Sequence, residues 1–224
     1  MIRRVFGNWQ ENAGVLIVWG FIAYISAIAL GSATYLIMYP LGQMVAGSVA
    51  TTVLLLTYSI VGIVAAGAAQ QGPTTIEKIW KRLKEKWMDV GTATVFAWIP
   101  FILGLLIFLA TVLYSIGSGS EVWANLGLLV FALGWFASVA TSVAPYIADA
   151  EGWKEAIEKT WTIAREKYIT LLLLAALFGI LYIIYIALLP TTFGWILAAL
   201  DATIMMHVRN LAYYEVIRSV QARE

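Results

Sequence analysis

Asp201 is the side chain of this sequence that is best placed to do chemistry, because it stands inside the apolar run LAALDATIMM. It lies about eight residues into a predicted membrane-spanning helix, which is roughly 12 Å along the helix axis. A carboxylate at that depth is costly unless it is neutral, paired or facing water. One interpretation is a proton or cation site. The other, which we favour because coupled transporters usually carry more than one intramembrane charge, is a protonated or hydrogen-bonded carboxyl that ties its helix to a neighbouring Ser, Thr or Tyr.

His207 is the single histidine of the chain, and Arg209 follows two residues later. Helical neighbours are three or four residues apart, so His207 and Asp201 do not face each other on one helix. One histidine without any cysteine does not make a standard zinc site. We expect His207 to lie at a helix end or against lipid headgroups. Ligand or ion binding by Asp201 and His207 is the alternative.

No arrangement of residues indicates catalysis or a bound cofactor. The chain has no cysteine, which excludes disulfides, thiolate metal sites and cysteine nucleophiles. Glycine-rich nucleotide motifs, zinc-protease motifs and a usable Ser/His/Asp set are also absent. Asp149 and Glu151, near Arg165 and Lys167, are interpreted as solvated charges or helix caps. We therefore predict a protein that is not an enzyme and that needs no cofactor.

Composition indicates that a lipid bilayer surrounds most of the chain. Of its 224 residues, 62% are hydrophobic and 12% are charged, whereas an ordinary globular domain has about 45–50% apolar and about 25% charged residues. A soluble core of this size cannot bury that excess, so lipid must act as the solvent. The net charge of +1 gives no attraction to nucleic acid.

Six apolar segments are long enough to cross about 30 Å of hydrocarbon. They cover approximately 13–38, 44–69, 91–116, 122–148, 168–189 and 193–210, and proline follows or ends several of them. Beyond the last segment, the helix is expected to continue with one apolar face formed by Tyr213, Val216, Ile217 and Val220. The predicted fold is all-α and integral to the membrane. Its six transmembrane helices form three hairpin repeats, about 1–72, 73–150 and 151–224, of one domain spanning 1–224.

A charged stretch occurs twice, at 76–87 and at 157–168, each time directly before an apolar span. Six positions are identical at an offset of 81 residues: Ile76/Ile157, Glu77/Glu158, Lys78/Lys159, Trp80/Trp161, Glu85/Glu166 and Lys86/Lys167. A more degenerate copy at 2–12 matches the first at an offset of 74. Apolar and basic residues fall on opposite helical faces, which is typical of a helix lying in the membrane interface. The predicted interface residues are Trp80, Lys78, Lys81, Arg82, Lys84, Trp87, Trp161, Lys159, Arg165 and Lys167.

The basic residues also predict the orientation of the chain. All fourteen Lys and Arg lie on the side of the two termini, and the loops at 39–43, 117–121 and 190–192 contain none. The positive-inside rule then places both termini and the amphipathic helices in the cytoplasm of a multi-pass cell-membrane protein. Small residues at four-residue spacing, such as Ala23, Ala27 and Gly31, predict close packing between helices.

The segment YIADAEGWKEAIEKTWTIAREKYITLL, residues 146–172, also resembles a known group of sequences. The matching positions are Asp149, Glu151, Gly152, Glu155, Ala156, Ile157 and Trp161, with Thr160 where serine is usual. The segment resembles polytopic membrane-domain families of bacteria and archaea that include the membrane domain associated with glycerophosphodiester phosphodiesterases. The resemblance implies a membrane-embedded, non-catalytic domain and gives no mechanism.

We consider two functions. The first is a non-catalytic module whose cytoplasmic amphipathic helices bind membrane lipids with anionic headgroups, a membrane-protein partner or a second copy of the chain. The alternative is a transporter or channel for a small solute, an ion or a lipid, with Asp201 as its site.

Overall fold

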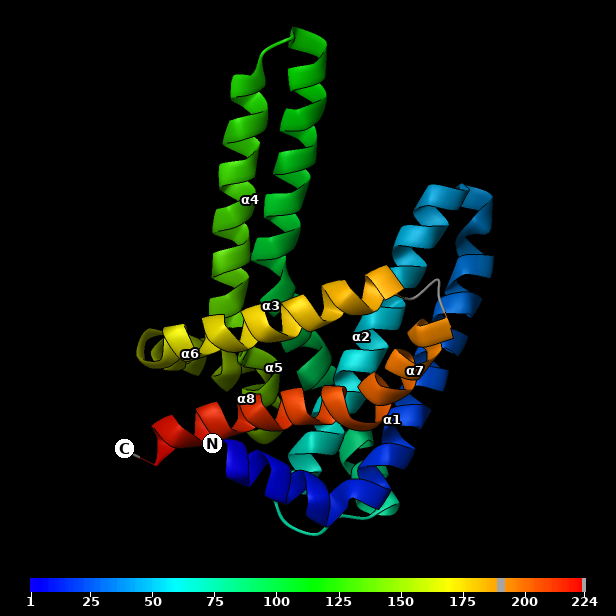
Figure 1. The fold of residues 1–224 in the computed structure, drawn as a ribbon, viewed down its shortest axis with the longest axis vertical. Coiled ribbons are helices and arrows are strands. Elements are labelled where there is room, and N and C mark those ends of the chain that lie inside the picture. The colour runs from blue at the N-terminus through cyan, green and yellow to red at the C-terminus, as the bar shows by residue number, and fades with distance from the viewer. Residues whose placement is uncertain (189–191, 223–224) are drawn as a thin grey trace.

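The computed structural model describes residues 1–188 and 192–222, and no strand occurs within these ranges (Figure 1). The helices are α1 (Ile2–Met38), α2 (Gln43–Gln70), α3 (Ile76–Ser118), α4 (Glu121–Thr141), α5 (Ala144–Glu151), α6 (Trp153–Leu188), α7 (Thr192–Leu200) and α8 (Met206–Gln221). A short 3-10 turn, Tyr39–Leu41, precedes α2, and a π-helical turn, Asp201–Met205, joins α7 to α8. The all-α class is therefore confirmed for the described residues.

Four helical segments in the described part of the chain are long and apolar enough to cross a bilayer: Ile2–Leu41, Gln43–Gln70, Ile76–Ser118 and Glu121–Glu151. In the most apolar stretch of α3, only 11% of the residues are buried inside the protein. Near its C-terminal end, Leu113 and Ile116 are 70% and 76% exposed. Apolar surface of this extent is unfavourable in water, so the protein is membrane-embedded. The predicted end of the fifth span at residue 189 and the adjoining Pro190 lie outside the described residues.

The long helices α1 to α4 pack in pairs that point away from a shared base, whereas α6 runs crosswise to these pairs (Figure 1). α1 packs along α2, and α3 packs along α4. At the base, α2 contacts α3, α5 and α8, and α1 also contacts α8. The N-terminal end of α1 and the C-terminal end of α8 lie at this base, where Arg4 approaches Glu215 of α8 to 4.0 Å.

Helix boundaries differ from the predicted ones in two ways. The amphipathic stretches at 2–12, 76–87 and 157–168 are the first turns of the continuous helices α1, α3 and α6, because no proline separates them from the apolar residues that follow. Conversely, the predicted helix at 122–148 is broken. α4 ends at Thr141, and α5 begins at Ala144 with Pro145 in its first turn, where the missing N–H costs nothing.

Small and apolar side chains fill the base. Its fully buried members include Leu16, Trp19, Val64, Val90, Met206 and Leu211. Ala23, Ala27 and Gly31 are all buried in α1, and an added Cβ on Gly31 would lie 3.3 Å from the carbonyl oxygen of Ala50 in α2. The predicted role of these small residues in helix packing is confirmed. The predicted apolar face of α8 is also buried: Tyr213, Val216, Ile217 and Val220.

Candidate functional site

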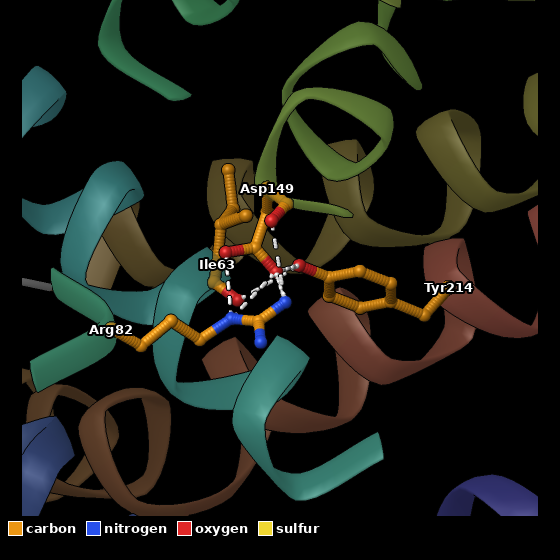
Figure 2. A network of polar contacts seen from close by, with 4 residues as sticks. All are labelled: Ile63, Arg82, Asp149 and Tyr214. Carbon is orange, nitrogen blue, oxygen red and sulfur yellow. Dashed lines mark hydrogen bonds and ion pairs between the residues drawn. The ribbon is translucent and has the colours of Figure 1, made fainter. Parts of the chain in front are cut away.

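A buried ion pair joins α3 to α5 at the base (Figure 2). Arg82 Nε donates to Asp149 Oδ1 at 2.9 Å, and Arg82 Nη2 donates to Asp149 Oδ2 at 2.7 Å. The Asp149 side chain is 0% exposed and that of Arg82 is 17% exposed. Two parallel N–H donors on one carboxylate fix the relative geometry of the two helices as well as neutralising the charge.

Tyr214 of α8 completes this cluster (Figure 2). Its hydroxyl donates to Asp149 Oδ2 and lies 3.2 Å from the carbonyl oxygen of Ile63 in α2. Burial raises the pKa of the Tyr214 phenol well above its usual value, and the negative charge of Asp149 acts in the same direction. The phenol therefore keeps its proton and remains a donor. Gly67 of α2 is required beside it, because a Cβ at that position would overlap Asp149 Oδ2.

These contacts correct two predictions. Asp149 is not a solvated charge, and Arg82 does not lie on the water-facing side of its helix. One signal in the sequence could have identified Arg82: it is the one basic residue of 76–87 whose counterpart 81 positions later, Ile163, is apolar. The cluster ties four helices together through charge and hydrogen bonds, which is the chemistry of a cross-link rather than of a catalyst.

Asp201 begins the π-helical turn and is 7% exposed. The hydroxyl of Tyr58 in α2 donates to Asp201 Oδ2 at 2.7 Å. The same turn is held from α1, where the indole of Trp9 donates to the carbonyl oxygen of Thr203 at 3.3 Å. Asp201 is therefore connected to a neighbouring helix through a tyrosine. Its role in binding an ion stays a prediction.

His207 is the second residue of α8 and is 0% exposed. It packs against α1, where a Cβ on Gly20 would lie 3.1 Å from His207 Nε2. Its ring does not reach the surface, so the predicted contact with lipid headgroups is wrong. The described residues contain no group of three or more His, Cys, Asp or Glu side chains that could hold a metal ion.

The other predicted interface residues remain on the surface. Trp80, Trp87 and Trp161 are 49%, 53% and 56% exposed. Among the other basic residues predicted at the interface, Lys167 is partly buried and the rest are exposed: Lys78, Lys81, Lys84, Lys159 and Arg165. Lys84 Nζ lies 5.3 Å from the centroid of the Trp80 ring, which is a cation–π contact. Lys159 also pairs with Glu151.

Comparison of the chain with protein-family models, with curated proteins and with solved structures gives no match. The resemblance of residues 146–172 to membrane-domain families therefore stays a prediction. Function has to be inferred from the residues and their geometry.

Proposed function

We propose that this protein is a non-catalytic integral membrane module whose amphipathic segments bind the anionic surface of the membrane. The observation that carries the proposal is the exposed aromatic and basic surface at the start of α3 and of α6. Trp80 and Trp87 each expose about half of their surface, and Lys84 lies between them in the sequence. Tryptophan at the headgroup level beside lysine is the composition of helices that lie in the membrane interface.

Matched burial supports the three repeats, each of which we propose to contribute two of six spans. At one position of the repeat, Val5, Ile79 and Thr160 are 3%, 0% and 0% exposed. At the next position, Phe6, Trp80 and Trp161 are 45%, 49% and 56% exposed. Further along each helix, the matched residues Leu16, Val90 and Leu171 are all 0% exposed. Three segments with the same inward and outward positions are what three related hairpins would require.

Orientation follows from the same surface. The first turns of α3, which carry exposed lysines, lie at the base together with the start of α1 and the end of α8. By the positive-inside rule this base faces the cytoplasm, where anionic lipids attract each basic residue near the surface with about 1 kcal/mol. Negatively charged phospholipid is therefore the proposed partner, and a membrane-protein partner or a second copy would occupy the same surface.

The test replaces Lys78, Lys81 and Lys84 by Gln in one variant. Arg82 is left unchanged, because its loss would break the buried pair with Asp149 rather than the surface. After reconstitution, spin-labelled phosphatidylglycerol and phosphatidylcholine report which lipid the protein prefers. We expect the variant to lose most of the preference for phosphatidylglycerol at low salt. This preference arises from electrostatic attraction to the lysines, which salt screens. The matching Lys→Arg variant should keep that preference, and an unchanged preference in the Gln variant would refute the proposal.

A transporter or channel is the second candidate, favoured by one observation. Asp201 is a buried carboxyl in a π-helical turn, a feature that often marks functional positions. Flux of protons and of monovalent cations into liposomes should then fall in Asp201→Asn and be altered in Tyr58→Phe. Equal and negligible flux in the wild type and in both variants would reject transport of these ions.

A further inference from the structure

A cavity of 730 Å³ lies between α2, α3, α4, α5, α6 and α8. Ligand pockets usually measure about 300–1,000 Å³, so this cavity is large enough for a specific occupant. It is distinct from the exposed basic surface at the start of α3. It is also distinct from the Arg82–Asp149–Tyr214 cluster, because none of those three residues lines it.

The two ends of the cavity differ in chemistry. α2 reaches the base at its C-terminal end and α3 leaves the base at its N-terminal end, so low numbers in α2 and high numbers in α3 lie far from it. The far end is mostly apolar: Leu55, Phe101, Ile102 and Leu105 line it beside Thr52. Toward the base most of the polar lining is found, Thr94, Ser142, Tyr146, Arg209 and Tyr213, together with the apolar Ile63. An occupant that matches both ends must itself be amphipathic.

Arg209 gives the polar end a positive charge. It is half-buried, and it is the one Lys, Arg, Asp or Glu among the described lining residues. Ordered side chains form the wall beside it: the rings of Tyr146 and Tyr213 stack with centroids 4.9 Å apart, and the Tyr146 hydroxyl donates to Asn210 Oδ1 at 2.9 Å. A partly desolvated guanidinium favours an anion, above all the oxygens of a phosphate group.

The apolar end is accessible from the bilayer. Leu55 and Ile102 line the cavity and are 46% and 41% exposed on helices whose outer surfaces are apolar. A hydrocarbon chain from the surrounding lipid can therefore enter sideways without crossing water. A water-soluble anion would leave this end unfilled.

We infer that the cavity binds one phospholipid with a negatively charged headgroup, its phosphate at Arg209 and an acyl chain between α2 and α3. This inference rests on the proposed function only in taking the bilayer as the protein's environment. It does not require the basic segments of α3 and α6 to bind lipid.

The experiment is native mass spectrometry of delipidated protein titrated with dioleoyl phosphatidylglycerol or with dioleoyl phosphatidylcholine. We expect one tightly bound phosphatidylglycerol per chain and weaker binding of phosphatidylcholine. Arg209→Gln should weaken phosphatidylglycerol binding by roughly fivefold to tenfold, the effect of about one basic residue on an anionic lipid. Leu105→Trp, which narrows the apolar end, should weaken both lipids.

Three controls separate this inference from the surface proposal. Arg209→Lys keeps the charge and should keep the preference for phosphatidylglycerol, whereas Arg3→Gln removes an exposed arginine and should change nothing. The Lys78, Lys81 and Lys84→Gln variant should retain the single bound lipid even where its preference among surrounding lipids is lost. Wild type that binds no phosphatidylglycerol at one per chain would overturn the inference. So would a folded Arg209→Gln that keeps the preference, or a folded Leu105→Trp that binds both lipids as the wild type does.

Discussion

The two copies of the amphipathic stretch, 76–87 in α3 and 157–168 in α6, share most of their pattern of burial, but at one inward position only the first copy carries a charge. Where the second copy has Ile163, 3% exposed in the apolar core, the first has Arg82. Arg82 points inward as Ile163 does, but it carries a charge that must be neutralised there. Asp149 of α5 supplies the opposite charge, and Tyr214 of α8 donates a hydrogen bond to that carboxylate.

This difference shows how a repeated helix can acquire a specific contact. An apolar residue at the inward position packs against any apolar neighbour, and its contribution depends on area alone. A charge at the same position is tolerated only with a partner in the correct orientation. The first copy is therefore held to specific residues of other helices, whereas the second copy is held by packing.

The largest effect is expected from Arg82→Ile, which gives the first copy the residue of the second. The variant leaves the Asp149 carboxylate buried without its cation, so the free energy of unfolding should fall by roughly 3–5 kcal/mol. Denaturant unfolding in detergent measures this change. Lys81→Gln, one residue away and exposed, should change stability by less than about 0.5 kcal/mol. The double variant Arg82→Ile, Asp149→Ala should recover most of the lost stability, because it leaves no unpaired charge. If Arg82→Ile alone were as stable as Lys81→Gln, the ion pair would contribute nothing to stability.

Gly67→Ala tests the space that the cluster needs. The added methyl group would overlap the Asp149 carboxylate and crowd the Tyr214 hydroxyl, which we expect to cost about 1–3 kcal/mol. Gly47→Ala, in the same helix but with no neighbouring atom within 4 Å, is the matched control. It should be neutral or stabilising, because alanine favours helix more than glycine does. Equal stability of the two variants would contradict the close approach of α2 to the cluster.

Tyr214→Phe should have the smallest effect, a loss of about 1 kcal/mol for one hydrogen bond. It should also change the response to alkaline pH. Because the pKa of Tyr214 is raised in the folded state, its contribution is complete below the ordinary tyrosine value and is lost as the pH rises. Above pH ~10, wild-type stability should therefore fall more steeply than that of the variant, by up to about 1.4 kcal/mol per pH unit. Thermal unfolding between pH 8 and pH 11 compares the two proteins, and Tyr114→Phe, at an exposed tyrosine, is the control. If the stability of the wild type and of Tyr214→Phe fell in parallel with pH, Tyr214 would not contribute to the stability of the cluster.

The sequence by itself determined the solvent of this protein and most of its helices. The free energy of transferring a helix into lipid is a sum over its residues. Long apolar runs such as those of α2 and α4 are therefore recognisable without any knowledge of their neighbours. The buried face of α8 and the small residues of α1 were also predictable, because helical periodicity places them on one side. The ends of the helices were less predictable, since Pro145 lies in the first turn of α5 and not near the end of the preceding helix.

Only the tertiary structure decided which polar groups meet. Arg82 and Asp149 are 67 residues apart, Asp149 and Tyr214 are 65 apart, and Tyr58 and Asp201 are 143 apart. Contacts of this range depend on how each helix is rotated about its own axis and on how close its neighbours come. Hydropathy constrains that rotation weakly when lipid and protein core are both apolar. Arg82 and Lys84 were therefore placed on one predicted polar face, whereas the fold turns Arg82 inward and Lys84 outward.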